Sequence, residues 1–482
     1  MIRVVMVNYG GGDLTLQSLE HLLRTEWPAD DLDIVLVDNP VENPDKPDNN
    51  PDNNPDNNPD KNLVTAGSAD GPPGSRGDDG VAERVHETMP RVRVLRSSTN
   101  LGFAGGNNLA LRDLEGIDHV ALVNNDVTVS PGWLKPLVAA LDNDPSLGAA
   151  SPKILLADRF VELVIEAPTH VPGRGDRREL GVRLGGARHP GTRAPLAVQH
   201  VSGFWGPQVD QTRGTGRVRG RRPATPAEHQ WSTGRARLRL PEPQSLAVEL
   251  LLAAPGAPGA SCGPGDESIP VTITSGDVVT RVEVGASDRW WPVAIARDRV
   301  DVVNNAGSVI VEGGFGADRG WLERDEGQYD APVEVEAWCG AAVLLRADYL
   351  RETGLFDERL FLYYEDLELS VRGARRGWRY RYEPASVVRH THSATAVEGS
   401  PLSHYHNERN RLLVLARHEP AADVVRALGR YLMVTGSYAR RDLAVPLLRG
   451  GRPTVSVVGQ RLRALGGFAR LAPSMWRDRR PR

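Results

Sequence analysis

The chain has 482 residues, of which 40% are hydrophobic and 25% are charged, and its formal net charge is -4. These values are typical of a globular chain long enough for two or three domains. The charge singles out no partner, and we expect no nucleic-acid partner. The two cysteines, Cys262 and Cys339, are far apart, which excludes a disulfide scaffold and a cysteine zinc site and favours a reducing compartment.

The sequence contains no apolar run near the roughly 18 residues that span a bilayer. Its beginning, Met1–Tyr9, is an apolar strand pattern without the features of a signal peptide. We therefore expect a cytoplasmic protein. Peripheral contact with the inner face of the cell membrane is expected only from the arginine-rich last part of the chain, described below.

The first part of the chain alternates short apolar strands with helical patterns. Such an order predicts an α/β fold, with a mostly parallel sheet and helices on both faces. The predicted strands are Ile2–Val7, Leu32–Val37, Val92–Leu95 and Val120–Val123. The helical patterns between and after them cover Leu14–Leu23, Leu109–Leu114 and Pro131–Leu141.

A low-complexity segment interrupts this pattern. Asn43–Asn62 repeats Asn-Pro-Asp-Asn, and Gly67–Gly80 consists mainly of Gly, Ser, Asp and Pro. Neither stretch carries enough apolar surface to offset the entropy of ordering it. The composition predicts a disordered insertion over about 40–81.

Polar side chains follow two of the predicted strands. Asp38 and Asn39 end the second strand, and Asn124-Asn125-Asp126 end the fourth. Ligands of open α/β sheets gather outside the carboxyl ends of the strands, so these groups are well placed to bind a nucleotide or a cation. The alternative is that they are ordinary turn residues.

The loop Asn100–Asn108 is rich in glycine and asparagine. Its glycines allow the backbone to approach a ligand closely, and the helix that follows offers its first N-H groups to an anion. A tight turn without a ligand would have the same composition.

From residue 158 the apolar period becomes two, with Pro and Gly turns between short runs, which predicts an antiparallel β-sandwich. The tryptophans of this region could line a sugar-binding face, although core packing is the commoner use of Trp. They are Trp205, Trp231, Trp290 and Trp291.

The alternation of strand and helix patterns resumes after residue 299, and a buried strand is predicted at Trp338–Leu345. Glu365 and Asp366 then stand at the start of a helix, where a carboxylate can act as a general base or simply cap the helix. His390 and His392 lie two apart on one strand, a spacing that can supply a metal ligand or place two histidines in solvent.

Several of these pieces, taken together in order, resemble the family 2 inverting glycosyltransferases of the GT-A fold, in particular the bacterial rhamnosyl- and galactofuranosyltransferase-like branch. The resemblance covers roughly 1–39, 90–157 and 299–416. The matching pieces are Val7-Asn8-Tyr9, Val37-Asp38-Asn39, Asn100 to Asn107, Asn124-Asn125-Asp126, Cys339-Gly340-Ala341, Gly354 to Glu358, Tyr364-Glu365-Asp366 and His390.

The resemblance implies a role for each matching residue. Asp366 is the catalytic base that deprotonates the acceptor. Asp126 binds a divalent cation, Mn²⁺ or Mg²⁺, with His390 as a further ligand and His392 as the less favoured choice. The implied nucleotide-sugar site consists of Asn8, Asp38, Asn100, Gly102, Asn107, Asn124, Asn125 and Glu365.

The implied function is the metal-dependent, inverting transfer of a sugar from a nucleoside diphosphate sugar to a hydroxyl of a glycan or a lipid-linked acceptor, in cell-wall or surface polysaccharide assembly. Two other functions stay open. One is a carbohydrate-binding protein with an inactive GT-A scaffold, against which the presence of both Asp126 and Asp366 argues. The other is a sugar nucleotidyltransferase, which would be expected to have a basic residue where Asp13 follows Gly10 to Gly12.

The last part of the chain is rich in arginine interleaved with apolar residues. This pattern is typical of a basic amphipathic segment that rests on anionic lipid, or of a solvated or partner-binding tail. The predicted organisation is a GT-A domain in two parts, 1–157 and 299–416, an inserted β-sandwich at 158–298, and a basic tail at 417–482.

Overall fold

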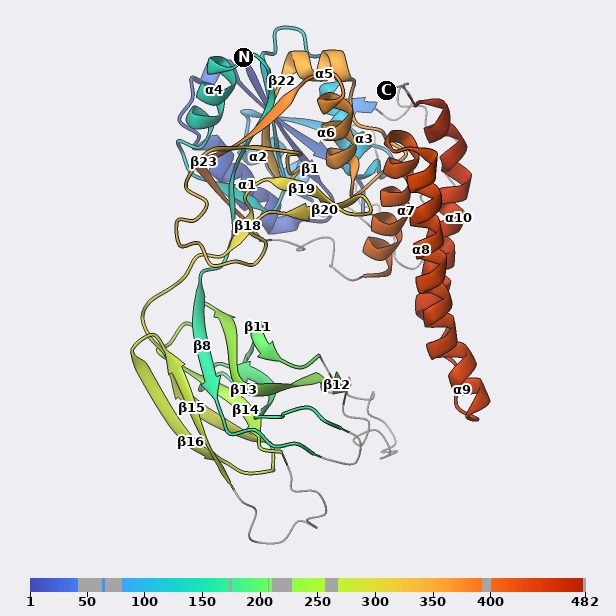
Figure 1. The fold of residues 1–482 in the computed structure, drawn as a ribbon. Coiled ribbons are helices and arrows are strands. Elements are labelled where there is room, and N and C mark those ends of the chain that lie inside the picture. The colour runs from blue at the N-terminus through green and yellow to red at the C-terminus, as the bar shows by residue number, and fades with distance from the viewer. Residues whose placement is uncertain are drawn as a thin grey trace. The chain divides into compact units, whose positions relative to one another are not determined.

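The computed structural model describes residues 1–41, 63–65, 80–172, 176–206, 208–209, 228–255, 268–391 and 400–479 (Figure 1). Most of the predicted insertion at 40–81 lies outside these ranges, as does His392. The chain forms two compact units, Met1–Ala157 with Val303–Arg482, and Asp158–Val302. They are called unit 1 and unit 2 below.

Unit 1 is built on a mixed sheet with the strand order β21-β23-β7-β22-β5-β1-β2-β4-β3. The middle of the sheet is parallel, because β1 (Ile2–Asn8) pairs with β2 (Leu32–Asp38) and β5 (His119–Val123), and β2 pairs with β4 (Val92–Ser97). The remaining strands are β3 (Leu63–Thr65), β6 (Val127–Val129), β7 (Leu147–Leu156), β18 (Val303–Asn305), β21 (Val333–Val335), β22 (Ala342–Arg346) and β23 (Arg379–His390).

The predicted α/β class is confirmed, but the second half of the sheet is less parallel than expected. β22 lies between β5 and β7 and runs antiparallel to both, while β23 runs parallel to β7. A buried antiparallel strand and a buried parallel strand carry the same continuous apolar pattern, so the sequence did not distinguish them.

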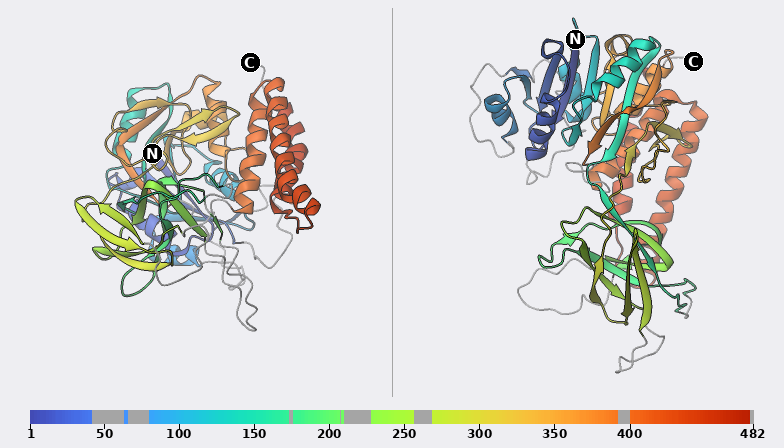
Figure 2. Two further views of the ribbon diagram at one scale, coloured as in Figure 1. Left: turned by 60° about the horizontal axis from the view of Figure 1, so that its bottom comes forward. Right: turned by 90° about the vertical axis from the view of Figure 1, so that its left-hand side faces the viewer.

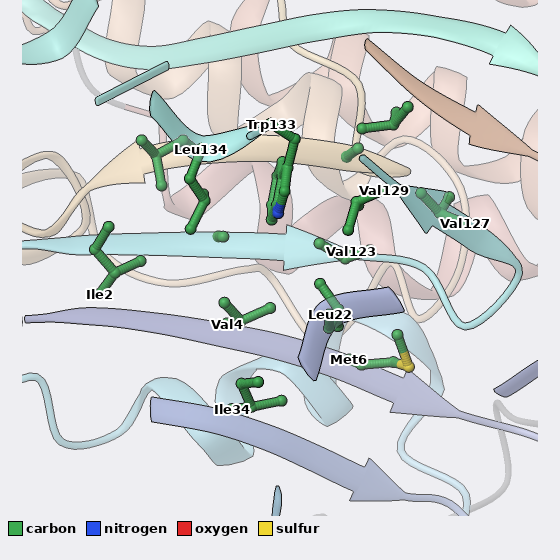
Figure 3. Close-up of a cluster of buried hydrophobic side chains, with 14 of the residues drawn as sticks. Ile2, Val4, Met6, Leu22, Ile34, Val123, Val127, Val129, Trp133 and Leu134 are labelled. Atoms are coloured by element: carbon green, nitrogen blue, oxygen red, sulfur yellow. The ribbon is translucent and has the colours of Figure 1, made fainter. Parts of the chain in front are cut away.

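Helices cover both faces of this sheet because its strands are apolar on both sides. Ile2, Val4 and Met6 of β1 join one core, with side chains of α1 (Gly12–Leu23), α2 (Val81–Thr88) and α4 (Leu134–Asn143), as Figure 3 shows in part. Val5 points the other way, into a core shared with α3 (Gly102–Leu111), α5 (Ala347–Thr353) and α6 (Glu365–Ala374). Val81, the last residue of the predicted insertion, is fully buried as the first residue of α2.

The carboxyl-terminal segment forms helices that pack on one another (Figures 1 and 2). They are α7 (Pro401–His418), α8 (Ala421–Ala439), α9 (Val445–Leu448) and α10 (Ser456–Arg477), with a π-helical stretch at Arg440–Ala444. Their shared core contains Leu360, Leu412, Tyr431 and Phe468. The predicted boundary between 416 and 417 therefore falls inside α7, and the basic segment is packed against the rest of unit 1 rather than a separate tail. In the part of the chain that the structure describes, no helix is both long and apolar enough to cross a membrane.

Unit 2 consists of antiparallel strands around one hydrophobic core. The long strand β13 (Glu228–Pro241) pairs at one end with β9 (Arg183–Arg188) and at the other with β8 (Phe160–Glu166), so that it joins two groups of strands. The other strands are β10 (Pro195–Leu196), β11 (Gln199–Phe204), β12 (Gln208–Val209), β14 (Ala247–Ala253), β15 (Ile269–Ser275), β16 (Val278–Val284) and β17 (Arg289–Ala294).

The tryptophan rings of unit 2 are paired with arginines. The Arg188 guanidinium lies 4.0 Å from the ring centroid of Trp290, and the Arg289 guanidinium lies 4.7 Å from that of Trp291. Trp291 also packs against the core. These contacts occupy ring faces that a sugar would need for stacking.

A buried ion network joins α6 to α7. Glu368 is fully buried, and its carboxylate lies 2.8 Å from Nη2 of Arg372, 3.0 Å from Nη1 of Arg417 and 2.9 Å from Nε2 of His418. Burial alone would raise the pKa of Glu368, but the hydrogen bond with His418 and the charges of the two arginines outweigh it and lower the pKa to about 2. The network anchors α6, the helix that begins with Glu365 and Asp366.

Replacing Glu368 by Gln should lower the free energy of unfolding at pH 7 by about 3 kcal/mol, because Arg372 then loses its carboxylate partner and Arg417 loses one partner. The folded-state pKa of about 2 lies below the ordinary value of 4.5, so the contribution of this carboxylate is complete above pH 4.5 and is lost as the pH falls towards 2. In urea unfolding at a series of pH values, the wild type should lose stability more steeply than Glu368→Gln over that interval.

Glu26→Gln is the matched control, because Glu26 and Lys135 form an exposed pair whose loss should cost less than about 1 kcal/mol. Parallel acid responses of the wild type and Glu368→Gln would contradict the assignment.

Candidate active site

Asn8 is the buried centre of the first part of the site, at the carboxyl end of β1. Its Oδ1 accepts hydrogen bonds from Thr15 Oγ1 at 2.8 Å and from the Gly11 backbone N-H at 3.2 Å, while its Nδ2 donates to Asp38 Oδ1 at 2.8 Å. Asn125 joins the same group by donating to Thr15 Oγ1 at 3.1 Å. The amides of Asn8 and Asn125 therefore position Asp38 and the loop before α1, and Asp38 is the partly exposed member of the group.

The predicted glycine-rich loop, Asn100–Asn108, begins with a turn that Asn39 and Phe361 hold in place. Asn100 Oδ1 accepts the Gly102 N-H at 2.9 Å. Gly102 has a φ of +65°, and a Cβ there would lie 2.5 Å from the backbone oxygen of Phe361, so only glycine fits. Asn39 holds the loop from the other side, because its Nδ2 donates to Gly102 O at 3.1 Å.

The helix that follows this loop begins at Gly102, seven residues before the predicted start at Leu109. The N-H groups of Phe103 and Ala104 donate to the backbone oxygen of Phe361 at 2.8 and 3.2 Å. The expectation that the first amides of this helix face an anion is therefore wrong for these two. Asn107, expected in the nucleotide-sugar site, is buried and donates to Phe103 O within its own helix at 2.9 Å.

Asp126 and His390 come together at the end of β5, although 263 positions separate them in the sequence. Nε2 of His390 lies 3.1 Å from Oδ1 of Asp126, and both residues are buried. The other ring nitrogen of His390 lies 2.9 Å from Oδ1 of Asn304. Asn124, the first residue of the triplet, is partly exposed, and its backbone N-H donates to Ala341 O at 2.9 Å.

This pair fits a divalent cation in its chemistry. Carboxylate oxygen and imidazole nitrogen are both ligands of first-row divalent metals. If Nδ1 of His390 carries the proton shared with Asn304 Oδ1, then Nε2 presents a lone pair towards Asp126, an arrangement that a cation would stabilise. Nε2 and Oδ1 are 3.1 Å apart, so Asp126 and His390 would be able to hold one cation together. Among the described residues, no group of three or more His, Cys, Asp or Glu side chains could hold a metal ion. Asp126 and His390 alone would therefore be the ligands of these types that the described residues offer to a cation.

Asp366 lies at the start of α6, with its two oxygens held by backbone amides. Oδ2 accepts the Gly340 N-H at 2.8 Å, and Oδ1 accepts the Leu367 N-H at 2.7 Å. Burial raises the pKa of this carboxyl, and the nearby charge of Asp318 acts in the same direction. Its side chain is still partly exposed, so it combines a fixed position with access from outside.

Glu365 is the more deeply buried of the two carboxyls, with 5% of its surface exposed. Its Oε2 has no hydrogen-bond partner among the described residues. Burial raises its pKa well above the ordinary range, and the neighbouring Asp366 adds to this effect. Its surroundings therefore favour the protonated form more than water does. The preceding Tyr363 and Tyr364 have φ values of +65° and +71°, a strained backbone of the kind found at functional sites.

The two halves of the site meet through the segment before β22. Ala341 O accepts from Asn124, two residues before Asp126, and the neighbouring Gly340 donates to Asp366. The Asp126–His390 pair and the candidate base thus lie at the same end of the central strands.

Sequence reasoning missed Thr15, Asn304 and Asp318, and it named Asn39 as a polar strand end but not as the residue that holds Gly102. Asn304 and Asp318 follow the long β region, in short strands without a recognised motif. The signal that could have found Asn304 is the polar pair Asn304-Asn305 directly after the apolar Val302-Val303.

Comparison with known proteins adds independent findings. Residues 74–178 match the model of the family described as glycosyl transferase family 2. Two curated relatives, both named N-acetylglucosaminyl-diphospho-decaprenol L-rhamnosyltransferase, from Mycobacterium tuberculosis strains CDC 1551 / Oshkosh and ATCC 25618 / H37Rv, are 33% identical over 111 residues. The match covers 21% of this chain and only 36% of the length of each relative.

Solved structures give weaker likenesses. GalNAc-T7 with UDP, GalNAc and Mn²⁺ is 12% identical with a TM-score of 0.43, over 96% of this chain and 54% of that chain. TarS 1-349 from S. aureus is 12% identical with a TM-score of 0.34, over 98% of this chain and 81% of that chain. Likenesses at this level carry no weight for function.

The family match spans the glycine loop and the Asn124–Asp126 triplet, while Asp366 and His390 lie beyond it. The resemblance first seen in the motifs is thereby supported independently, and residues 74–178 are similar to glycosyl transferase family 2.

Proposed function

We propose that this protein is a metal-dependent, inverting glycosyltransferase that moves a sugar from a nucleoside diphosphate sugar to a hydroxyl of a lipid-linked or glycan acceptor, in cell-wall or surface polysaccharide assembly. The observation that carries the proposal is the presence, at the same end of the central strands, of the Asp126–His390 pair and of the amide-held Asp366. The names of the curated relatives, which specify a lipid-linked substrate and rhamnosyl transfer, support the acceptor class.

The donor half of the site is formed by residues at the carboxyl ends of β1, β2 and β5. Asp38, positioned by Asn8, is suited to a hydrogen bond with the nucleoside. Asp126 and His390 would hold a divalent cation, Mn²⁺ or Mg²⁺, which when bound supplies positive charge to the leaving diphosphate. Two of the first backbone N-H groups of α3 already donate hydrogen bonds to the backbone oxygen of Phe361, so they are not available to a phosphate. A cation would supply the positive charge that this helix end does not.

The acceptor half is organised by α6. Asp366 takes the proton of the acceptor hydroxyl while that oxygen attacks the anomeric carbon. The bond between this carbon and the diphosphate oxygen breaks on the opposite face, and the configuration inverts. The two backbone hydrogen bonds keep the carboxylate in place, and its raised pKa suits a group that must accept a proton. Glu365, whose Oε2 has no hydrogen-bond partner among the described residues, is suited to a hydrogen bond with a sugar hydroxyl.

Loss of the base and loss of the metal carboxylate should differ. Asp366→Asn should lower the rate by about a hundred- to ten-thousand-fold, with little change in binding of nucleoside diphosphate with Mn²⁺. Asp126→Asn should lower both the rate and the metal-dependent nucleotide affinity, because its carboxylate acts in ground and transition states alike. The measurements are calorimetric titration of nucleoside diphosphate with Mn²⁺ and initial rates with a competent donor and acceptor.

Glu365→Gln is the matched control, since it keeps a hydrogen-bond donor next to the base and should be milder. Turnover close to wild type in Asp366→Asn would show that the base is another group.

The carboxyl-terminal helices have a charge composition that suits binding to an anionic membrane. Between residues 421 and 477 the chain has two aspartates, Asp423 and Asp442, each paired with an arginine. The ten arginines of the same stretch are Arg426, Arg430, Arg440, Arg441, Arg449, Arg452, Arg461, Arg463, Arg470 and Arg477.

Large apolar side chains stand among these arginines. Met433 on α8 is 73% exposed, and Leu447 and Leu448 in α9 are 62% and 87% exposed. Apolar side chains flanked by cations suit an anionic bilayer surface, where each near-surface charge contributes about 1 kcal/mol. We propose that this face holds the enzyme at the inner face of the cell membrane.

The double variant Leu447→Glu, Leu448→Glu should bind vesicles of phosphatidylglycerol at least tenfold more weakly than the wild type, as measured by co-sedimentation at low salt. Leu402→Glu, on an exposed leucine of α7, is the control and should bind as the wild type does. Equal binding of all three proteins would contradict the proposed contact.

A further inference from the structure

A cavity of about 650 Å³ lies within unit 1, beside the helix that carries the candidate base. Its walls come from α6, α7, α8, Arg461 of α10 and the hairpin of β19 (Ser308–Val311) and β20 (Phe315–Asp318). This size is typical of a site for a small organic ligand. Neither the donor chemistry nor the membrane-facing side chains Leu447 and Leu448 use it.

The lining of the cavity is mainly apolar. The apolar residues that matter here are Ile310, Phe315, Leu367, Val371, Leu415 and Val434. These residues come from five separate elements, so the apolar surface encloses a cavity rather than lying along the exposed face of a single helix.

The charged groups around the cavity neutralise one another. Glu312 pairs with Arg430 at 2.9 Å, and Asp423 pairs with Arg426. Glu408 lies between two arginines, 3.3 Å from Nη2 of Arg411 and 2.9 Å from Nη1 of Arg461. Arg411 also lies over the Phe315 ring, 4.2 Å from its centroid. The carboxylates are thus matched by guanidinium groups, and the remaining surface favours an uncharged, apolar ligand.

The cavity begins one residue from the base. Leu367, which lines it, directly follows Asp366 and donates its backbone N-H to the Asp366 carboxylate at 2.7 Å. The candidate base and the wall of the cavity are therefore neighbours at the start of α6.

The far side of the cavity opens to the surface. Ile310, Phe315 and Val434 line it and are still 38%, 46% and 45% exposed. Val434 belongs to α8 and directly follows Met433, which is part of the proposed membrane face. The cavity therefore has an apolar mouth at the surface, which suits the entry of an apolar chain.

We propose that this cavity binds the isoprenoid chain of a lipid-linked acceptor and aligns the acceptor head group with Asp366. The proposal rests on the proposed function and deepens it by assigning the acceptor to the lipid-linked class. A glycan acceptor in the same cavity is the competing outcome.

The test is equilibrium dialysis of the full chain, without membranes, with farnesyl phosphate as a soluble isoprenoid probe. Val434→Asp and Ile310→Asp place a charge on two different walls and should each raise the Kd at least tenfold. Both side chains are partly exposed, so folding should persist, and either variant suffices if the other misfolds. Val425→Asp is the matched control, because Val425 lies on the same helix, is 68% exposed and does not line the cavity.

Two further ligands identify which part of the probe is recognised. Farnesol should bind within tenfold of farnesyl phosphate, and inorganic phosphate should not compete. No farnesyl phosphate binding by the wild type, or equal binding by the cavity variants and Val425→Asp, would overturn the proposal. Competition by a soluble oligosaccharide, lost in the cavity variants, would overturn it in favour of a glycan site.

Binding of nucleoside diphosphate with Mn²⁺ is measured on the same preparations. Its absence, with farnesyl phosphate binding intact, would count against the glycosyltransferase proposal alone. Its presence, without farnesyl phosphate binding, would count against the cavity proposal alone.

Discussion

The pairing of β22 with β5 is the constraint on which the candidate site depends. Val123 at the end of β5 is the register partner of Ala342, the first residue of β22. This register brings Ala341 to Asn124 and leaves Gly340 positioned to donate to Asp366. The antiparallel entry of one strand into the middle of a parallel sheet thus sets the second half of the site against the first.

The polar residues of the site fall into two groups with different physical roles. Buried amides such as Asn8, Asn39 and Asn125 satisfy loop backbones and each other, and leaving any of their partners unsatisfied would cost about 1–3 kcal/mol. The carboxylates of Asp126 and Asp366 are instead held in fixed positions at the same end of the central strands. The first group builds the loops that the second group needs in order to act.

Sequence patterns predicted the class of the fold and several contacts of the site, but not all of its geometry. The strand of Val120–Val123 and its polar end were recognisable, because apolar runs and the residues that stop them are local features. The pairing of His390 with Asp126 was suggested by family resemblance alone, since no local pattern links residues so far apart. The strand direction of β22, the early start of α3 at Gly102 and the Asn304 contact depend on tertiary packing. The roles assigned to Asp366, Glu365 and the nucleotide-sugar residues stay predictions.

The sheet of unit 1 also shows how a long insertion is accommodated. Leu155 of β7 and Val303 of β18 are register partners, so the points where the chain leaves and re-enters unit 1 are neighbours across one ladder. A connection between adjacent ladder positions can be two residues or a whole domain, because the entropy of closing a loop rises by only about 0.6 kcal/mol for each doubling of its length. At this junction a short hairpin turn in place of unit 2 would join the same two strands, without any change in the pairing that supports the site.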